Sequence, residues 1–180
     1  MNLRQRTRRL IATLLALLGL GAAPHAHALE EGELKAAIIF NILLFVDWPP
    51  EAQPETGGAL GFCVGPDSSL HAALKALNDR PIRGYRFEVR DPTAPDAAKS
   101  CHAAFIDSSD RQRKAASLKA LRASGVLVFS DHADATADAT AVVLQRTGNK
   151  IAFDVNLQAV RRARLQVSSK LLRLARVVRE

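Results

Sequence analysis

The chain has 180 residues, enough for one domain with a hydrophobic core, and its 25 basic and 18 acidic residues give a formal net charge of +7. Four of the arginines lie within the first nine residues, so the remainder of the chain carries a much smaller excess. One tyrosine, one tryptophan and no basic–aromatic motif argue against nucleic-acid binding.

The N-terminus has the layout of a secretory signal peptide. A cationic segment ending at Arg9 precedes an apolar stretch over residues 10–23, and Ala26-His27-Ala28 is a small-x-small cleavage site. The alternative is an uncleaved membrane anchor, but this stretch is shorter than the ~20 residues that a spanning helix needs. The sequence therefore predicts cleavage between Ala28 and Leu29, a periplasmic location, and a single domain over residues 29–180.

Two cysteines remain after cleavage, Cys63 and Cys101. An even number in an exported chain favours one disulfide, worth on the order of 4 kcal/mol for a loop of this length. Two buried free thiols are the alternative. Cys63 stands late in its predicted strand and Cys101 early in its own, which would separate them if the two strands were level parallel neighbours.

The first half of the predicted domain alternates helices with short apolar strands. The pattern predicts a helix over 33–48 that ends at Pro49-Pro50, a strand over 59–65, a helix over 68–78 capped by Asp67 or Ser68, and a strand over 85–90. In that last strand, apolar Tyr85, Phe87 and Val89 alternate with charged residues, which predicts one solvated face.

The second half continues the alternation and adds a hairpin. The pattern predicts strands over 101–106 and 126–131, a helix over 110–124 between them, an exposed loop over 132–141, and a hairpin over 141–156 that turns at 147–149. Residues 157–180 read as helical with a break near 166–169, where Ser168 or Ser169 caps a final helix. Its apolar stripe comprises Leu171, Leu172, Leu174, Ala175, Val177 and Val178. The predicted class is α/β: a mostly parallel central sheet with helices on both faces, a C-terminal β-hairpin and terminal helices.

The sequence offers no convincing set of catalytic, cofactor-binding or metal-binding residues. His71, His102 and His132 stand apart from other reactive groups. Cys101 and His102 are neighbours on a strand and point to opposite faces, so they cannot easily chelate one ion. Ser108-Ser109-Asp110 lacks the G-x-S-x-G pattern of a nucleophile elbow and is more simply a helix cap. We therefore expect no enzyme activity, cofactor or metal.

The predicted helix over 33–48 is apolar on nearly every side. Phe40, Phe45 and Trp48 cannot all point the same way as Ile38 and Ile42. Either this helix packs in one core with the final helix, or it keeps a second apolar face for a homodimer or another partner.

The order of motifs resembles the YfiR family of periplasmic proteins. The resemblance rests on "ELKAAIIFNILLFVDWP", "LGFCVGPDSSLHAAL", "CHAAFIDSS", "GVLVFSD" and "IAFDVNLQAVRRARLQVSSKLLRLARVV", which together span nearly all of residues 29–180. It implies export, an α/β fold, a tendency to form homodimers and no catalysis. The implied role is to bind the periplasmic domain of an inner-membrane diguanylate cyclase and hold it inactive, which limits cyclic-di-GMP and biofilm formation.

The resemblance also assigns roles to individual residues. Cys63 and Cys101 match one cysteine pair of the family, through which redox control would act, whereas Thr136 and Val143 occupy the positions of a second pair. Asp154 matches an acidic position of the family's partner-binding face, and Val142 and Val160 align with apolar positions nearby.

The leading hypothesis is a periplasmic regulatory protein that represses a membrane-bound signalling enzyme, a diguanylate cyclase or a sensor kinase. The rival hypothesis is a periplasmic sensor that binds a small molecule at the carboxyl edge of the sheet. The loops after Val64, Ile106 and Phe129 would line that site.

Overall fold

The computed structural model describes residues 24–92, 100–107, 125–132 and 140–180, with side chains described from residue 31 onward. The chain divides into two units at residues 31 and 32, and the second unit contains the fold. The elements are α2 (Pro24–Leu43), β1 (Val46–Asp47), the 3-10 helix η1 (Pro50–Ala52), β2 (Ala59–Cys63), α3 (His71–Lys75), β3 (Pro81–Ile82), β4 (Tyr85–Arg90), β5 (Ala103–Ile106), β6 (Leu127–Ser130), β7 (Val142–Thr147), β8 (Lys150–Asn156), α6 (Leu157–Arg162), β9 (Gln166–Val167), α7 (Ser169–Leu174) and β10 (Val177–Arg179).

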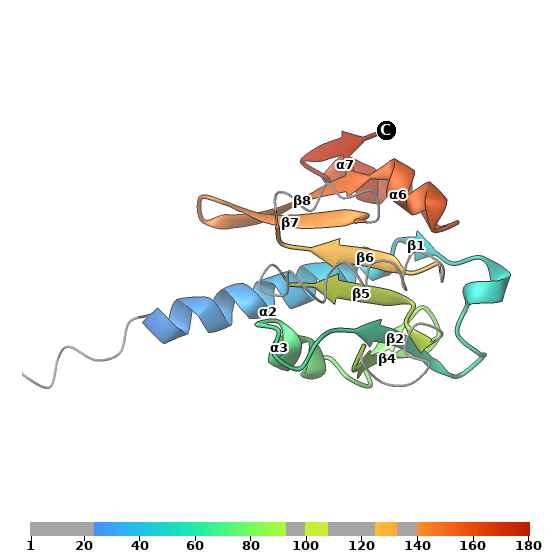
Figure 1. The fold of residues 1–180 in the computed structure, drawn as a ribbon, viewed down its shortest axis with the longest axis horizontal. Coiled ribbons are helices and arrows are strands. Elements are labelled where there is room, and N and C mark those ends of the chain that lie inside the picture. Colours follow the sequence, from blue (N-terminus) through green and yellow to red (C-terminus); the bar gives the residue numbers. More distant parts are fainter. Residues whose placement is uncertain (1–23, 93–99, 108–124, 133–139) are drawn as a thin grey trace, which may run out of the picture. The chain divides into compact units, whose positions relative to one another are not determined.

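Eight of the described strands form one mixed sheet in the order β10-β8-β7-β6-β5-β2-β4-β3 (Figure 1). The five central strands, from β7 to β4, are parallel to one another. The antiparallel β7–β8 hairpin extends one side of the sheet and β3 extends the other. The mostly parallel α/β class is therefore confirmed. The helix predicted over 110–124 lies outside the described residues. Within the described residues, the helices after α2 are few and short.

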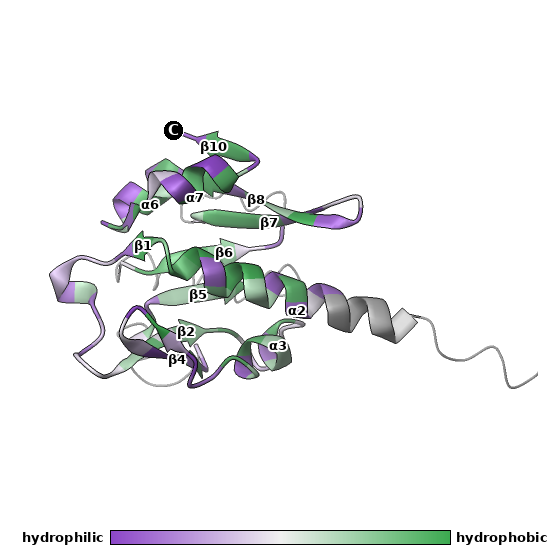
Figure 2. Cartoon of the chain, turned by 180° about the vertical axis from the view of Figure 1, so that it is seen from behind, coloured by the Kyte–Doolittle hydropathy of each residue, from purple (hydrophilic) through white to green (hydrophobic). Residues whose placement is uncertain are grey.

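The main core lies between the sheet and the part of α2 from Gly32 onward, which crosses β5 and β6 (Figure 2). Phe40 of α2 packs edge-on against Phe87 with ring centres 5.5 Å apart, and Phe62 joins Phe87 to Phe129. Because successive strand residues face opposite ways, a second cluster lies on the other face: Cys63, Cys101, Ala104, Ile106, Val126 and Val128. The apolar surplus of α2 is mostly buried in the main core.

The predicted helix over 33–48 ends too late. α2 stops at Leu43, and Val46-Asp47 form β1, which pairs antiparallel with β9. This extended segment buries Val46 and Trp48, and the indole Nε1 of Trp48 donates to the carbonyl oxygen of His102 at 3.0 Å. Tertiary pairing and burial thus override the helical pattern ahead of Pro49.

The predicted final helix also differs from the structure. Ser168 caps α7 as predicted, because its hydroxyl accepts from the backbone N–H of Leu171. The helix then ends at Leu174, and Val177–Arg179 form β10, parallel to β8 at the edge of the sheet. The predicted apolar stripe is therefore split: Leu171 is buried, while Leu174, Val177 and Val178 are exposed.

Candidate functional site

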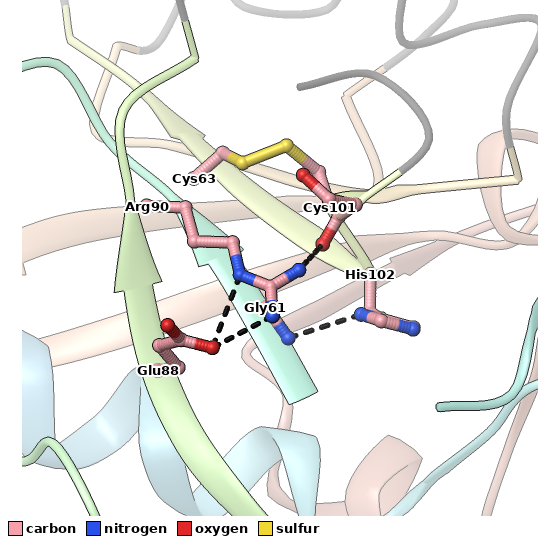
Figure 3. Close-up of a disulfide and its surroundings, with 7 residues drawn as sticks. Gly61, Cys63, Glu88, Arg90, Cys101 and His102 are labelled. Carbon is pink, nitrogen blue, oxygen red and sulfur yellow. Dashed lines mark hydrogen bonds and ion pairs between the residues drawn. A yellow bond between two sulfur atoms is a disulfide. The ribbon is translucent and has the colours of Figure 1, made fainter. Parts of the chain in front are cut away.

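Cys63 and Cys101 form a disulfide on the sheet face opposite α2, with their Cα atoms 5.6 Å apart (Figure 3). The predicted separation of the two residues is wrong because β2 and β5 are staggered. Phe62 and Cys63, at the end of β2, pair with Ala103 and Ala104, at the start of β5. Cys63, at the end of β2, therefore lies beside Cys101, which stands just before β5.

Contacts that involve no sulfur also hold the segment that carries Cys101. The backbone N–H of His102 donates to the carbonyl oxygen of Gly61 at 2.8 Å, and the N–H of Gly61 donates to His102 Nδ1 at 3.0 Å. Arg90 donates from Nη1 to the carbonyl oxygen of Ser100 at 2.7 Å and forms a two-point ion pair with Glu88 (Figure 3). We call Gly61, Glu88, Arg90, Ser100 and His102 the bridge clamp.

Gly61 is the position in this clamp that tolerates no side chain. A Cβ added there would lie 2.1 Å from the carbonyl oxygen of Ser100 and 2.9 Å from Nη1 of Arg90. The absent side chain is what lets the Ser100 backbone approach β2 closely enough for Arg90 to reach it.

His102 has a structural role that its isolated place in the sequence did not reveal. Burial is the main cause that lowers the pKa of His102 to about 4, and the positive charge of Arg90 is the second cause. The imidazole is therefore neutral at neutral pH, with its proton on Nε2, because Nδ1 accepts the hydrogen bond from Gly61. His102 fastens β2 to the segment that leads into β5.

The three residues predicted to bind a partner are buried. Val142 and Val160 belong to the main core, and Asp154 on β8 is only 4% exposed. Asp154 pairs with Val143 across the β7–β8 hairpin, so its side chain and that of Val142 lie on opposite faces of the sheet. The structure thus brings these residues close together but does not place them on one exposed face, and their role in binding a partner stays a prediction.

Sequence reasoning missed the partner of Asp154. Arg176, just before β10, donates from Nε to Oδ1 of Asp154 at 2.9 Å and from Nη2 to Oδ2 at 2.6 Å. The same Nη2 also reaches Oε1 of Gln145 at 2.8 Å. Among the aligned positions of the second cysteine pair, Val143 is half-buried and Thr136 lies outside the described residues.

Polar groups gather at the carboxyl ends of the parallel strands. Asp107, after β5, accepts at Oδ2 from the hydroxyl of Ser68, which follows β2, at 3.1 Å. Lys35 of α2 pairs with Oδ2 of Asp131, after β6, at 3.2 Å, and Oδ1 of Asp131 is buried without a hydrogen-bond partner among the described residues. The chain runs from β2 to β4 on one side and to β5 on the other, so the strand order reverses between β2 and β5.

Within the described ranges, no three His, Cys, Asp or Glu side chains come together in a way that could hold a metal ion. Ser108 and Ser109 lie outside these ranges. Over the same part of the chain, no helix combines the length and the apolar character needed to cross a bilayer.

Two comparisons with known proteins agree with this architecture. The family model described as YfiR/HmsC-like matches residues 32–176. The crystal structure of a conserved domain protein from Vibrio cholerae O1 biovar El Tor str. N16961 is similar in fold, with a TM-score of 0.51 at 10% sequence identity. The match covers 82% of this chain and 60% of that chain, and at this identity it supports the fold alone.

Proposed function

This chain belongs to the YfiR/HmsC-like family, and we propose that it is a periplasmic regulatory protein that binds and represses a membrane-bound signalling enzyme, a diguanylate cyclase. Repression would limit cyclic-di-GMP and, through it, biofilm formation. The role is regulatory and acts by contact: the folded protein binds the periplasmic domain of the enzyme and stabilises its inactive arrangement. A sensor kinase is the other membrane-bound enzyme that such a protein would control.

The observation that carries this proposal is the family match, which runs through the main core, the disulfide and Asp154. The disulfide supports export, because such bridges form and persist outside the reducing cytoplasm. We propose that residues 1–28 form the signal peptide that directs this export and that the mature domain starts at Leu29. We also propose that the mature protein is a homodimer, which light scattering on the processed protein would test.

Deletion of the gene in its native host tests the proposal. Cyclic-di-GMP should rise in the deletion strain and return to its original level when the full chain is supplied again. A matched version without residues 2–28 should not restore it, because the product would stay in the cytoplasm. An unchanged cyclic-di-GMP level in the deletion strain would refute repression of a cyclase.

A second candidate function is the binding of a small molecule at the carboxyl edge of the sheet. It is supported by the reversal of strand order between β2 and β5 and by Oδ1 of Asp131 at that edge, which has no hydrogen-bond partner in the part of the chain that the structure describes. A ligand that bears an ammonium or hydroxyl donor would satisfy that oxygen. Such a ligand should raise the Tm of the wild-type protein but not that of Asp131→Asn; a library that shifts neither protein would count against this function.

A further inference from the structure

The C-terminal segment combines positive charge with a lack of carboxylates. Residues 155–179 contain no Asp or Glu and seven basic residues: Arg161, Arg162, Arg164, Lys170, Arg173, Arg176 and Arg179. The same segment forms α6, β9, α7 and β10; α6, α7 and β10 lie together at one end of the sheet (Figure 2), and β9 pairs with β1. This end of the fold is therefore strongly cationic.

Some of these cations form ion pairs that have a structural role, and others form none with the described residues. Arg176 is paired with Asp154, and Arg164 with Glu51. In contrast, Lys170, Arg173 and Arg179 are exposed and make no ion pair in the part of the chain that the structure describes. Their charges are thus available to an anion outside the protein.

Exposed aliphatic side chains stand among these free cations. Leu174 is 67% exposed, and Val177 and Val178 follow at 37% and 38%. Lys170, Arg173 and Leu174 share the outer face of α7, because residues three and four apart on a helix are neighbours. Figure 2 shows hydrophilic and hydrophobic residues interleaved along α6 and α7, next to the mainly hydrophobic β10.

We propose that the outer face of α7, which consists of Lys170, Arg173 and Leu174 and which we call the basic–apolar surface, binds an anionic phospholipid membrane. Peripheral membrane binding combines buried apolar area with the attraction of basic side chains to anionic headgroups. The alternative is an acidic protein partner. Protein interfaces concentrate their binding energy in large anchors packed into pockets, aromatic side chains above all, whereas this surface carries no aromatic side chain and lies on the exposed face of a short helix.

The inference goes beyond the proposed function, because it does not depend on which enzyme is repressed. Binding to the bilayer would confine the protein to a layer next to the membrane and raise its concentration near any membrane-anchored partner. Glu180, which follows the segment and is acidic, accepts a hydrogen bond at its main-chain oxygen from Nε2 of Gln158 at 3.3 Å.

Vesicle co-sedimentation of the processed protein tests the proposal. The protein should bind phosphatidylcholine vesicles that contain about one third phosphatidylglycerol at low salt, and should bind them much less in about 0.5 M salt. Pure phosphatidylcholine vesicles should leave it in solution. Failure to bind the anionic vesicles, or equal binding to both kinds, would overturn the proposal.

A matched pair of variants separates this surface from net charge. K170E/R173E should lose about tenfold or more of the binding to anionic vesicles. K75E/K150E changes net charge by the same amount at exposed lysines elsewhere and should bind as the wild type does. Leu174→Ser changes an exposed apolar side chain. It should weaken the part of the binding to anionic vesicles that remains when the salt concentration is raised. Equal losses in the two double variants would overturn the proposal.

The cellular readout distinguishes this idea from the proposed function. Loss of repression in K170E/R173E, without any binding of the wild-type protein to vesicles, would assign the surface to an acidic protein and overturn the lipid proposal. Unchanged cyclic-di-GMP on gene deletion would instead refute the proposed function and leave the vesicle result standing.

Discussion

Arg176 holds Asp154 through two hydrogen bonds, and the carboxylate is almost completely buried while the guanidinium is partly exposed. The ion pair connects the residue just before β10 to β8, the strand with which β10 pairs. The side chains of β10 itself are exposed. β10 therefore depends on its backbone ladder and on this ion pair more than on apolar burial.

Replacing Arg176 should loosen the C-terminal strand. Arg176→Met leaves the Asp154 carboxylate buried without its partner and should lower the free energy of unfolding by about 2–4 kcal/mol. Urea denaturation measures the loss, and hydrogen exchange should show faster exchange at Val177–Arg179. Arg179→Met, on β10, replaces an exposed side chain that makes no ion pair among the described residues and should change stability by less than about 0.5 kcal/mol. Equal stability of the two variants would show that the ion pair contributes nothing.

Gly61→Ala should be strongly destabilising. The new Cβ would collide with the Ser100 carbonyl oxygen, and the resulting shift would break the Arg90–Ser100 hydrogen bond. We expect a loss of about 3 kcal/mol or more in the free energy of unfolding. Gly65→Ala is the control, because a Cβ at that position meets nothing within 4 Å. A Gly61→Ala protein as stable as the Gly65→Ala protein would contradict the close approach.

Removal of the disulfide should cost stability but leave the fold intact. The bridge joins residues 38 apart, so C63A/C101A should be less stable by about 4 kcal/mol in the chain-entropy description. The bridge clamp should still hold the Ser100–His102 segment against β2. Urea denaturation with and without dithiothreitol measures this: the reductant should destabilise the wild-type protein and leave the variant unchanged. If the backbone amides of β2 and β5 in the variant lose their protection against hydrogen exchange, the bridge clamp alone is not sufficient to hold this segment.

The stability of the protein should fall on acidification through His102. Its pKa lies at about 4 in the folded protein instead of the ordinary 6.5, so the unfolded chain takes up the proton first. The stabilisation from neutral His102 is thus complete above about pH 6.5 and is lost as the pH falls toward 4. His102→Asn can still accept the Gly61 hydrogen bond and cannot titrate. Its stability should decline less steeply over this range, and parallel declines would contradict the assignment.

Processing of the N-terminus should leave Leu29 as the first residue. Intact mass and N-terminal sequencing of the periplasmic protein would show this directly, whereas an uncleaved anchor would retain residues 1–28. Cleavage there would cut α2 between its fifth and sixth residues. Glu30, Glu31 and Glu33 would then stand in the first turn, where negative charge favours a helix.

Local sequence patterns were enough to place most of the sheet. Apolar runs and alternation predicted β2, β4, β5, β6 and the β7–β8 hairpin, whose turn uses Gly148 at a positive φ. Ser168 as a cap could also be predicted, because capping depends on residues only a few positions apart.

The elements that were missed depend on pairing between distant segments. Val46-Asp47 and Val177–Arg179 become strands only because Gln166-Val167 and β8 lie beside them. The stagger that joins Cys63 to Cys101 is likewise a property of two strands together. The burial of Asp154 follows from an arginine 22 residues further along the chain, which no local pattern contains.

The position of β10 at the rim of the sheet has a practical consequence for labelled versions of this protein. An affinity tag after Glu180 would extend from β10, whose side chains are exposed, and one placed before residue 29 would be lost if the proposed signal peptide is cleaved. The exposed tip at Gly148-Asn149 joins two strands through a two-residue loop. An epitope spliced there would leave both chain ends in their native state, so fusions at the tip should report on cellular behaviour more faithfully than terminal ones.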